Sequence, residues 1–402
     1  MVDRESASQD LRHGVDGARP VLEVNGLRTH LRSSAGVVRA VDGVSFTIGK
    51  GEVFAVVGES GSGKSMMAKS VMGLAPRDAA VQDGAILFEG EDLRRASRRR
   101  LRQLRGDRIA MIFQDPLTSL NPIFPVGWQI AEALKVHRDV SRRTAWDAAV
   151  DALQKVGIPN PERRARDYPH QFSGGMQQRA MIAMAMICDP RLLIADEPTT
   201  ALDVTIQAQI LGLLLGIRET HGTSIMLITH DLGIVAGVSD RLAVMYAGQL
   251  HEIGRTEKVF AAPRGPYTLG LLASIPAVSA PSGQPLTTIP GLPPTLVGDG
   301  DGCRFAPRCA YVTEACLTTP VPLVPRPEDG EVRCLRAEEP DWSDVVAARP
   351  VVGSTEDGAG LASIARDVEA PVRRSRAAVD EEPLLRVEGL ARSFRIRRGG
   401  LG

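Results

Sequence analysis

The feature that most constrains this chain is a glycine-rich segment, GESGSGKS (58–65), between two apolar runs. The run VFAVV before it predicts a buried strand, and KSMMAKSVMGL after the glycines predicts a helix. The segment fits G-x-x-x-x-G-K-[ST] in the strand–loop–helix context that this pattern requires. Its glycines let backbone N–H groups turn around an anion, and the helix start adds partial positive charge. The sequence therefore predicts a phosphate-binding loop.

The nucleotide contacts expected from this loop involve its whole length and the start of the helix. They are Gly58, Glu59, Ser60, Gly61, Ser62, Gly63, Lys64, Ser65 and Met66. Lys64 is expected to reach the β- and γ-phosphates, and the Ser65 hydroxyl to bind Mg²⁺. The alternative, a glycine-rich turn with an exposed lysine, does not explain the flanking strand and helix.

Composition narrows the class of protein. The chain has 402 residues, with 48 acidic and 48 basic side chains, so overall charge favours neither nucleic acid nor an acidic partner. No apolar run approaches the roughly 20 residues that cross a bilayer, and the polar start MVDRESASQDLRHG lacks a signal-peptide core. We expect a cytosolic protein that reaches any membrane through a partner.

The pattern of segments predicts an α/β fold. Apolar strands such as IAMIF (109–113), LLIAD (192–196) and SIMLIT (224–229) alternate with helical segments, which favours a mostly parallel sheet covered by helices. From about residue 261 the sequence becomes rich in proline, then in cysteine, and finally in Ala, Arg, Asp and Glu. The predicted domains are a flexible leader at 1–20, a nucleotide-binding domain at 21–260 with a helical subdomain at about 115–185, a C-terminal module at 261–340, a linker at 341–383 and a possible second domain from 384 to 402.

An internal repeat is the reason for proposing a second domain. LLRVEGLARSF (384–394) matches VLEVNGLRTHL (21–31) at Leu22/Leu385, Val24/Val387, Gly26/Gly389 and Leu27/Leu390. Chance recurrence of a strand–turn pattern is the alternative. Because a linker precedes the repeat, the sequence favours the start of a second copy of the first domain.

Acidic residues and a histidine follow other predicted strands. Asp196 and Glu197 end RLLIADEP, where an acid can hold the Mg²⁺ shell and the next can act as general base toward water. His230 follows SIMLIT at the same predicted sheet edge, where a γ-phosphate contact is expected. The alternatives are that the acids cap a helix and that the histidine is structural.

A second phosphate-binding helix start is predicted in FSGGMQQR (172–179). Ser173 can cap the following helix, and Gly174 and Gly175 allow the backbone close to an anion.

Together these motifs resemble the ATP-binding cassette (ABC) family: the P-loop, Gln114 in IFQDP, the SGGMQ signature, LLIADE, ALD (201–203) and His230, over about Val21–Gly254. The resemblance implies a P-loop NTPase cassette with a mostly parallel sheet and a helical subdomain. It also implies that two cassettes pair head to tail, so that Ser173, Gly174, Gly175 and Gln177 of one meet ATP on the other. Gln114 would sense Mg²⁺ and water, and Asp203 would lie at the interface.

One position departs from that family, which usually has an aromatic residue stacking on adenine near the end of the first strand. The matching residue is Leu31, with His30 as a possible substitute, and Phe394 occupies the position in the repeat. An apolar contact from Leu31 predicts weaker affinity for the base.

Further stretches resemble the dipeptide and oligopeptide importer ATPases: QDPLTSLNP (114–122), GPYTLGLLASIP (265–276) and IPGLPP (289–294). This resemblance implies ATP and Mg²⁺ as cofactors, and ATP hydrolysis that powers peptide import at the cytoplasmic face of the membrane. The implied partners are a second cassette, two integral-membrane permease subunits contacted near Thr118–Val126, and indirectly an extracytoplasmic peptide-binding protein. A translation or DNA-repair cassette ATPase, or an inactive scaffold, remains the alternative.

Four cysteines cluster near the C-terminal end with the spacing C-x₅-C-x₆-C-x₁₇-C: Cys303, Cys309, Cys316 and Cys334. Four thiolates can hold zinc or an iron–sulfur cluster. The spacing is wider than in usual structural zinc sites and, with the importer resemblance, favours a structural [4Fe–4S] cluster over zinc or no metal. Cys188, inside an apolar helix, is expected to be a core residue.

Overall fold

The computed structural model describes residues 19–76, 79–115, 119–200, 202–275, 288–294, 297, 302–326, 330–338 and 389. The chain divides into residues 1–353 and 354–402, and all contacts below belong to the first unit. The predicted linker, most of the leader, and the repeat with Phe394, apart from Gly389, lie outside the described residues, so these remain predictions.

The larger of two sheets combines parallel and antiparallel strands. Its strands are β3 (Val53–Val57), β6 (Ile109–Ile112), β7 (Leu192–Asp196), β8 (Ser224–Ile228), β9 (Arg241–Tyr246), β10 (Gln249–Arg255), β11 (Val324–Pro325) and β12 (Glu331–Val332). Their order is β11-β12-β10-β9-β3-β8-β7-β6, with β6, β7, β8, β3 and β9 mutually parallel. The continuous apolar runs of β3, β7 and β8 are buried at every position, as in a sheet covered on both faces. This confirms the predicted mostly parallel α/β fold.

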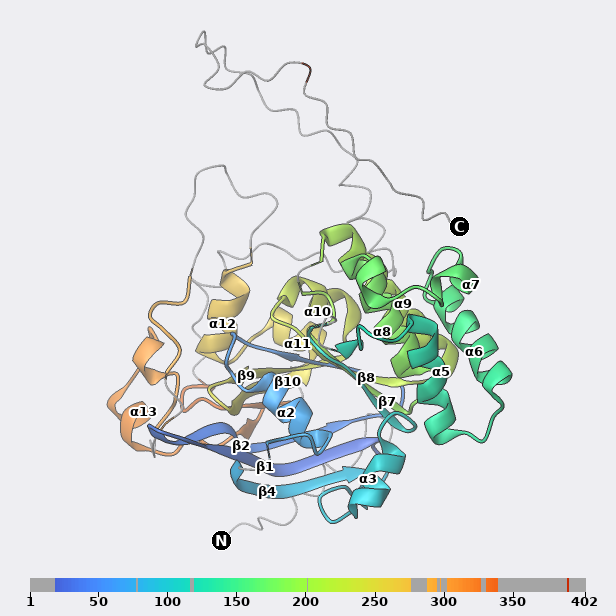
Figure 1. Ribbon diagram of the computed structural model, residues 1–402. Coiled ribbons are helices and arrows are strands. Elements are labelled where there is room, and N and C mark those ends of the chain that lie inside the picture. The colour runs from blue at the N-terminus through green and yellow to red at the C-terminus, as the bar shows by residue number, and fades with distance from the viewer. Residues whose placement is uncertain are drawn as a thin grey trace. The chain divides into compact units, whose positions relative to one another are not determined.

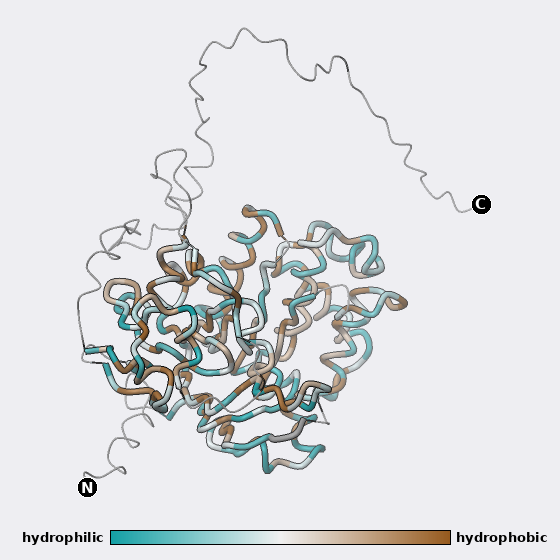
Figure 2. Tube along the Cα trace, turned by 90° about the vertical axis from the view of Figure 1, so that its left-hand side faces the viewer, coloured by the Kyte–Doolittle hydropathy of each residue, from teal (hydrophilic) through white to brown (hydrophobic). Residues whose placement is uncertain are grey.

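A second, antiparallel sheet forms the layer at the bottom of Figure 1. It contains β1 (Leu22–Ser33), β2 (Gly36–Ile48), β4 (Ala79–Phe88) and β5 (Glu91–Asp92), and α3 (Arg98–Leu104) follows it in the chain. The helix α2 (Lys64–Val71) packs between the two sheets, because Met67 shares one core with Val24 of β1 and Phe54 of β3. Polar and apolar residues are interspersed along the compact part of the chain in Figure 2, and the fold turns the apolar ones inward.

A helical lobe lies at one side of the sheet, on the right of Figure 1. It is built from α5 (Val126–His137), α6 (Arg142–Lys155), α7 (Pro161–Arg164), the 3-10 turn η1 (Pro169–Gln171) and α8 (Gly174–Met186). Its core uses small residues, so that Ala145 and Ala149 of α6 and Ala180 of α8 are fully buried. Cys188 is 5% exposed in the loop after α8, which confirms a buried residue although it lies just beyond the helix end.

The remaining helices cover the sheet and connect it to the C-terminal region. They are α9 (Val204–His221), α10 (Leu232–Val238), α11 (Thr256–Ala261), α12 (Pro266–Ala273), the 3-10 turn η2 (Ala306–Arg308) and α13 (Glu314–Thr318). None of the helices in the described ranges has the length and apolar character needed to cross a bilayer.

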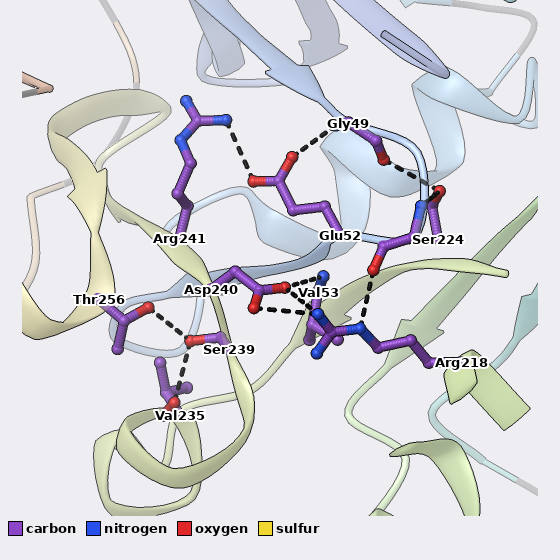
Figure 3. Close-up of polar contacts among 11 residues, drawn as sticks. Gly49, Glu52, Val53, Arg218, Ser224, Val235, Ser239, Asp240, Arg241 and Thr256 are labelled. Atoms are coloured by element: carbon purple, nitrogen blue, oxygen red, sulfur yellow. Dashed lines mark hydrogen bonds and ion pairs between the residues drawn. The ribbon is translucent and has the colours of Figure 1, made fainter. Parts of the chain in front are cut away.

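Polar side chains tie together the edge of the sheet where β3 and β9 begin (Figure 3). The Asp240 carboxylate accepts the N–H of Val53 at 2.8 Å and pairs with Arg218 at 3.1 Å. Glu52 accepts the N–H of Gly49 and forms an ion pair with Arg241 at 3.2 Å. These groups satisfy one another's hydrogen-bonding capacity at the amino ends of the strands. In sheets of this kind, ligands bind at the opposite side, where the carboxyl ends of the strands lie.

The C-terminal module joins the sheet through strand pairing and a buried ion pair. β12 adds to β10 as an antiparallel strand. The Arg326 Nη1 atom lies 2.7 Å from the Glu252 carboxylate, and both side chains are 0% exposed. Glu252 also accepts the N–H groups of Arg264 and Gly265, so its charge is fully engaged inside the protein.

Candidate nucleotide site and cysteine cavity

The predicted P-loop lies between β3 and α2, as the sequence pattern requires. Gly58 has φ 152° and Gly63 has φ 106°, both unfavourable for other residues. A Cβ atom at Gly58 would lie 2.0 Å from the carbonyl oxygen of Met245, and one at Gly63 would lie 2.2 Å from that of Ala40. Gly63 offers no side-chain cap, so the first N–H groups of α2 face the loop without one. The backbone therefore has the form of an anion-binding cradle.

The charged groups of the loop are held by neighbours within the chain. Lys64 is 4% exposed, and its Nζ atom donates to the carbonyl oxygens of Gly58 at 2.8 Å and Glu59 at 2.9 Å. The Ser65 hydroxyl donates to Asp196 Oδ1 at 2.9 Å. This contact joins the start of α2 to the end of β7, although Ser65 and Asp196 are 131 residues apart in the sequence.

Burial shifts the pKa values of two facing groups, Lys64 of the P-loop and Asp196 at the end of β7. It lowers the pKa of Lys64, against the opposing attraction of Glu197, Asp196 and Glu59. Burial likewise raises the pKa of Asp196, against the Ser65 hydrogen bond. Both groups are therefore desolvated, and each charged form would gain from an oppositely charged ligand.

Glu197 lies at the centre of a polar cluster. Its Oε2 atom accepts hydrogen bonds from Gln114 Nε2 and Thr200 Oγ1, both at 2.9 Å. His230 Nδ1 lies 3.7 Å from Glu197 Oε1, and its side chain is 60% exposed. Because Gln114, Glu197 and His230 follow three parallel strands, the fold brings their side chains to one edge of the sheet.

The signature residues lie at the start of α8 in the helical lobe. Ser173 caps this helix by accepting the N–H of Met176, as predicted, and Ser173 and Gly174 are exposed. Gln177 is 6% exposed and donates to the carbonyl oxygens of Pro169 and Phe172, so its amide supports the preceding loop from inside. The exposed Asp203 caps α9 by accepting the N–H of Ile206 at 3.0 Å.

The hairpin of β1 and β2 carries the residues considered for adenine. Leu31 is half-buried and faces Val38 across the hairpin, next to an irregularity in the register. The His30 ring lies 3.2 Å from Asp42 Oδ1 and is therefore engaged by the hairpin itself. Asp42 also forms an ion pair with Arg304 of the C-terminal module.

The four clustered cysteines line one small cavity in the C-terminal module. Other residues around it include His251 from β10 and Tyr267 from α12. His251 is 4% exposed, and no hydrogen-bond partner reaches its Nε2 atom within the described structure. Burial and the nearby Arg333 and Arg304 lower the pKa of this histidine to about 3, so the ring is neutral.

Backbone amides point at these sulfur atoms. The N–H of Tyr311 donates to Cys309 Sγ, and that of Arg336 to Cys334 Sγ, both at 3.4 Å. All four cysteines are free thiols, and burial raises the pKa of Cys334 to about 11. Within the described ranges, no three His, Cys, Asp or Glu side chains are gathered as they would be around one metal ion.

A third feature is an exposed groove between the sheet and the helical lobe. It is lined by Met72, Leu74, Arg105, Gly106, Ala110, Met111, Phe113, Ser119, Ala133, His137, Met181, Met184 and Ala185. Leu74 is 40% and Phe113 38% exposed, so the groove offers apolar surface to solvent. Its methionines and leucine form a surface that can adapt to an apolar partner.

The structure adds residues that motif reasoning missed. Thr200, three residues after Glu197, fixes that carboxylate and could have been noticed from the turn it occupies. Tyr267 and Arg308 contact the P-loop from positions more than 200 residues later. No local pattern marks such distant contacts, because tertiary packing alone creates them.

Sequence profiles of two known families match this chain. The ABC transporter profile matches residues 41–200, which include the P-loop, Gln114, the signature and Glu197. The profile of the oligopeptide/dipeptide transporter C-terminal region matches residues 251–316.

Individual proteins are similar over most of the chain. The dipeptide transport ATP-binding protein DppD of Bacillus subtilis is 54% identical over 297 residues, covering 74% of this chain and 88% of the relative. The oligopeptide transport ATP-binding protein OppD of Bacillus subtilis is 52% identical over 292 residues, covering 72% and 82%. A dimeric ATP-binding cassette solved in a post-hydrolysis state with ADP and Pi shares the fold, with a TM-score of 0.54 and 24% identity over 58% of this chain and 98% of that one.

Proposed function

The chain belongs to the ABC transporter ATPase family, in the branch of oligopeptide and dipeptide importers, and on that premise we propose that it binds and hydrolyses ATP to power peptide import. One observation carries the proposal: the Ser65–Asp196 and Gln114–Glu197 contacts join three motifs, which follow three parallel strands, at one edge of the sheet. That edge is where such folds bind nucleotides.

The site residues then have distinct roles. The backbone of Gly58–Ser65 cradles the phosphates, Lys64 neutralises their charge, and Ser65 with Asp196 holds the Mg²⁺ that ATP brings. Glu197 orients and deprotonates the attacking water, which Gln114 helps to position. His230, exposed beside Glu197, contacts the γ-phosphate as it separates.

Hydrolysis requires a second cassette in this proposal. Ser173 and Gly174 are exposed at the N-terminus of α8, which suits them to the γ-phosphate of ATP bound to the partner cassette. The exposed Asp203 lies where that interface is expected. Gln177 acts indirectly, by holding the loop before the signature. The partner is another copy, a sister subunit or a second domain of the same polypeptide.

The head-to-tail pairing of two cassettes can be tested with a variant that binds ATP but cannot hydrolyse it, because such a variant should accumulate as a dimer. Glu197→Gln should bind ATP without hydrolysing it and elute as a dimer in size-exclusion chromatography, when mixed with its partner cassette if one is needed. Ser173→Arg in that background should abolish ATP-dependent dimerisation by filling the anion site. Arg163→Ala, an exposed change on α7, serves as the matched control. Persistent dimerisation of the Ser173→Arg variant would contradict the proposed role of the signature.

The proposed membrane partners are two integral permease subunits, with an extracytoplasmic peptide-binding protein acting through them. The chain would then be peripheral at the cytoplasmic face, and no nucleic acid would take part. The groove lined by Leu74 and Phe113 is the proposed permease contact, and Ser119 of the predicted contact region Thr118–Val126 also lines it, whereas Thr118 lies outside the described residues. Its apolar surface suits a short amphipathic helix of the permease.

Two experiments test the transport function. Cells lacking the gene should lose uptake of a radiolabelled dipeptide or tripeptide, and a Lys64→Ala copy should fail to restore uptake. Leu74→Glu should abolish stimulation of ATP turnover by the permeases while basal turnover remains. Val136→Glu, at an exposed position outside the groove, is the control. Restoration of uptake by Lys64→Ala would contradict the proposal.

We further propose a [4Fe–4S] cluster at Cys303, Cys309, Cys316 and Cys334, with a structural role. The support is that all four thiols line one cavity, that backbone N–H groups already point at two sulfur atoms, and that the buried His251 Nε2 lacks a partner there. When bound, the cluster would cross-link segments that have little regular structure of their own.

Anaerobic purification tests the cluster against zinc and against no metal. Iron and acid-labile sulfide at about four per chain with broad absorption near 400 nm would support it. Cys309→Ser should remove both, whereas Cys188→Ser should not. Stoichiometric zinc, or the absence of any metal, would contradict the cluster.

A further inference from the structure

Three segments of the C-terminal region converge on one residue of the P-loop, Glu59. The Tyr267 hydroxyl accepts the N–H of Glu59 at 2.9 Å. Arg308 of η2 forms a two-pronged ion pair with the Glu59 carboxylate, at 2.6 Å from Nη1 and 2.9 Å from Nη2. In the IPGLPP segment, the Pro290 carbonyl oxygen accepts a hydrogen bond from Arg308 Nε at 2.8 Å.

Arg308 is fully engaged in this position. Its Nε and Nη groups also contact the carbonyl oxygens of Pro290 and Ile289 and the Tyr246 hydroxyl, so contacts reach all three guanidinium nitrogens. The guanidinium carbon lies 5.8 Å from the centre of the Tyr246 ring, and the side chain is only 5% exposed. An arginine bound on every side has little freedom, so it fixes the carboxylate that it contacts.

The charge of Glu59 gives this contact a consequence for ligand binding. Glu59 lies inside the loop that cradles phosphate, and its backbone carbonyl oxygen accepts from Lys64 Nζ at 2.9 Å. A free carboxylate there would repel an anionic ligand and compete for Lys64. The Arg308 guanidinium pairs with this carboxylate through both terminal nitrogens and so offsets its negative charge.

We propose that Arg308 is a positioning residue of the nucleotide site, through which the C-terminal module completes the P-loop and raises its affinity for ATP. The inference rests on the proposed function and extends it to a residue 249 positions from Glu59 in the chain. It also gives a role to the IPGLPP segment and to the turn between Cys303 and Cys309. Neither segment takes part in hydrolysis itself.

A double-mutant cycle on the full chain tests the proposal. Arg308→Met leaves an unpaired carboxylate and should weaken binding of Mg-ATP about tenfold, measured as Kd with a fluorescent ATP analogue. Glu59→Gln should change the Kd less than about threefold, and Glu59→Gln with Arg308→Met should restore it to that level. Binding to adenosine, which carries no charge, should be the same in all four proteins.

The outcomes separate a charge effect from a merely structural one. Equal weakening in Arg308→Met and in the double variant would overturn the proposal, because removal of the carboxylate would then not rescue binding. An unchanged Kd in Arg308→Met would also overturn it. If Arg308→Met does not fold, Arg308→Gln takes its place in the same cycle: it should weaken ATP binding about tenfold, Glu59→Gln should rescue that loss, and failure of the rescue would overturn the proposal.

The same assay distinguishes failure of this inference from failure of the proposed function. Wild-type chain that does not bind ATP, or a Lys64→Ala variant that binds it equally well, would contradict the nucleotide site itself. Normal wild-type binding with no dependence on the Arg308 charge would contradict this inference alone.

Discussion

The nucleotide site and the C-terminal cysteine module are both built from loops, yet different forces hold them in place. The P-loop, Glu197 and His230 follow strands of one parallel sheet, whose ladders fix the backbone on each side. In the described part of the module that carries the cysteines (302–326 and 330–338), the regular elements are the short β11, β12, α13 and η2. Four arginines, two buried and two half-buried, attach it to the rest of the chain: Arg308 to Glu59, Arg326 to Glu252, Arg304 to Asp42 and Arg333 to the Leu250 carbonyl oxygen.

This difference indicates where a mutation can change activity without changing stability, and where it cannot. At a sheet edge, a functional side chain can change while the ladders keep the backbone in place. In the module, the charged side chains are themselves the attachment, so removal of one leaves a buried charge without a partner. We therefore expect large losses of activity with small losses of stability at the nucleotide site, and the reverse where the module is attached away from the P-loop, as at Arg326.

The largest effect is expected for Glu197→Gln. Loss of the general base should lower the turnover number for ATP about 10³-fold, while the free energy of unfolding changes by less than about 1 kcal/mol. Steady-state hydrolysis and urea denaturation measure the two quantities, with the exposed Glu257→Gln as control. Unchanged turnover would instead favour the inactive scaffold.

Arg326→Met should be the most destabilising change in the comparison. It leaves the fully buried Glu252 carboxylate without its cation, which should cost about 3–5 kcal/mol in the free energy of unfolding. Replacing both partners, by Arg326→Met with Glu252→Gln, should cost less because no unpaired charge remains. Urea denaturation compares the variants, and a single variant as stable as the double one would break the distinction between the two regions.

Leu31→Phe should improve the nucleotide site by a smaller amount. An aromatic ring at this half-buried position can stack on adenine, which should tighten ATP binding about fivefold, or about 1 kcal/mol. Inorganic tripolyphosphate, which has no base, should bind as before. Val37→Phe, at an exposed position of the same hairpin, is the control, and an equal gain there would argue against stacking.

The smallest effect concerns pH and the ion pair between Asp42 and Arg304. Burial alone would raise the pKa of Asp42, but Arg304 together with His30 and Arg39 outweighs it and lowers the pKa below 3.8. The unfolded chain therefore takes up the proton first, so the stability from Asp42 is present above pH 3.8 and is lost as pH falls through the folded pKa.

Asp42→Asn checks this sign. The variant should be less stable than wild type at pH 6 by about 1 kcal/mol in free energy of unfolding, and the gap should close toward pH 3. A gap that widens on acidification would contradict the assigned direction of the pKa shift.

Local patterns predicted the central sheet well. LLIAD was expected as a strand and forms β7 over the same five residues, and IAMIF and SIMLIT each exceed the observed strands by one residue. Such runs are recognisable because a parallel strand buried on both faces must be apolar throughout. The antiparallel layer is harder to predict, since β2 extends over Gly36–Ile48 but the local pattern indicates a strand only at VSFTI (44–48). Its remaining residues are strand because of pairing with β1, which no local pattern encodes.

By itself, the sequence determined the identity and order of the groups that we propose handle phosphate: Lys64, Ser65, Asp196, Glu197 and the signature. Their motifs are local, since glycine placement and a strand–loop–helix context suffice to define each one. Tertiary structure alone decided that Tyr267 and Arg308 reach Glu59 and that Arg304 reaches Asp42. Those contacts depend on packing between segments far apart in the chain, where the burial of a charge selects its partner.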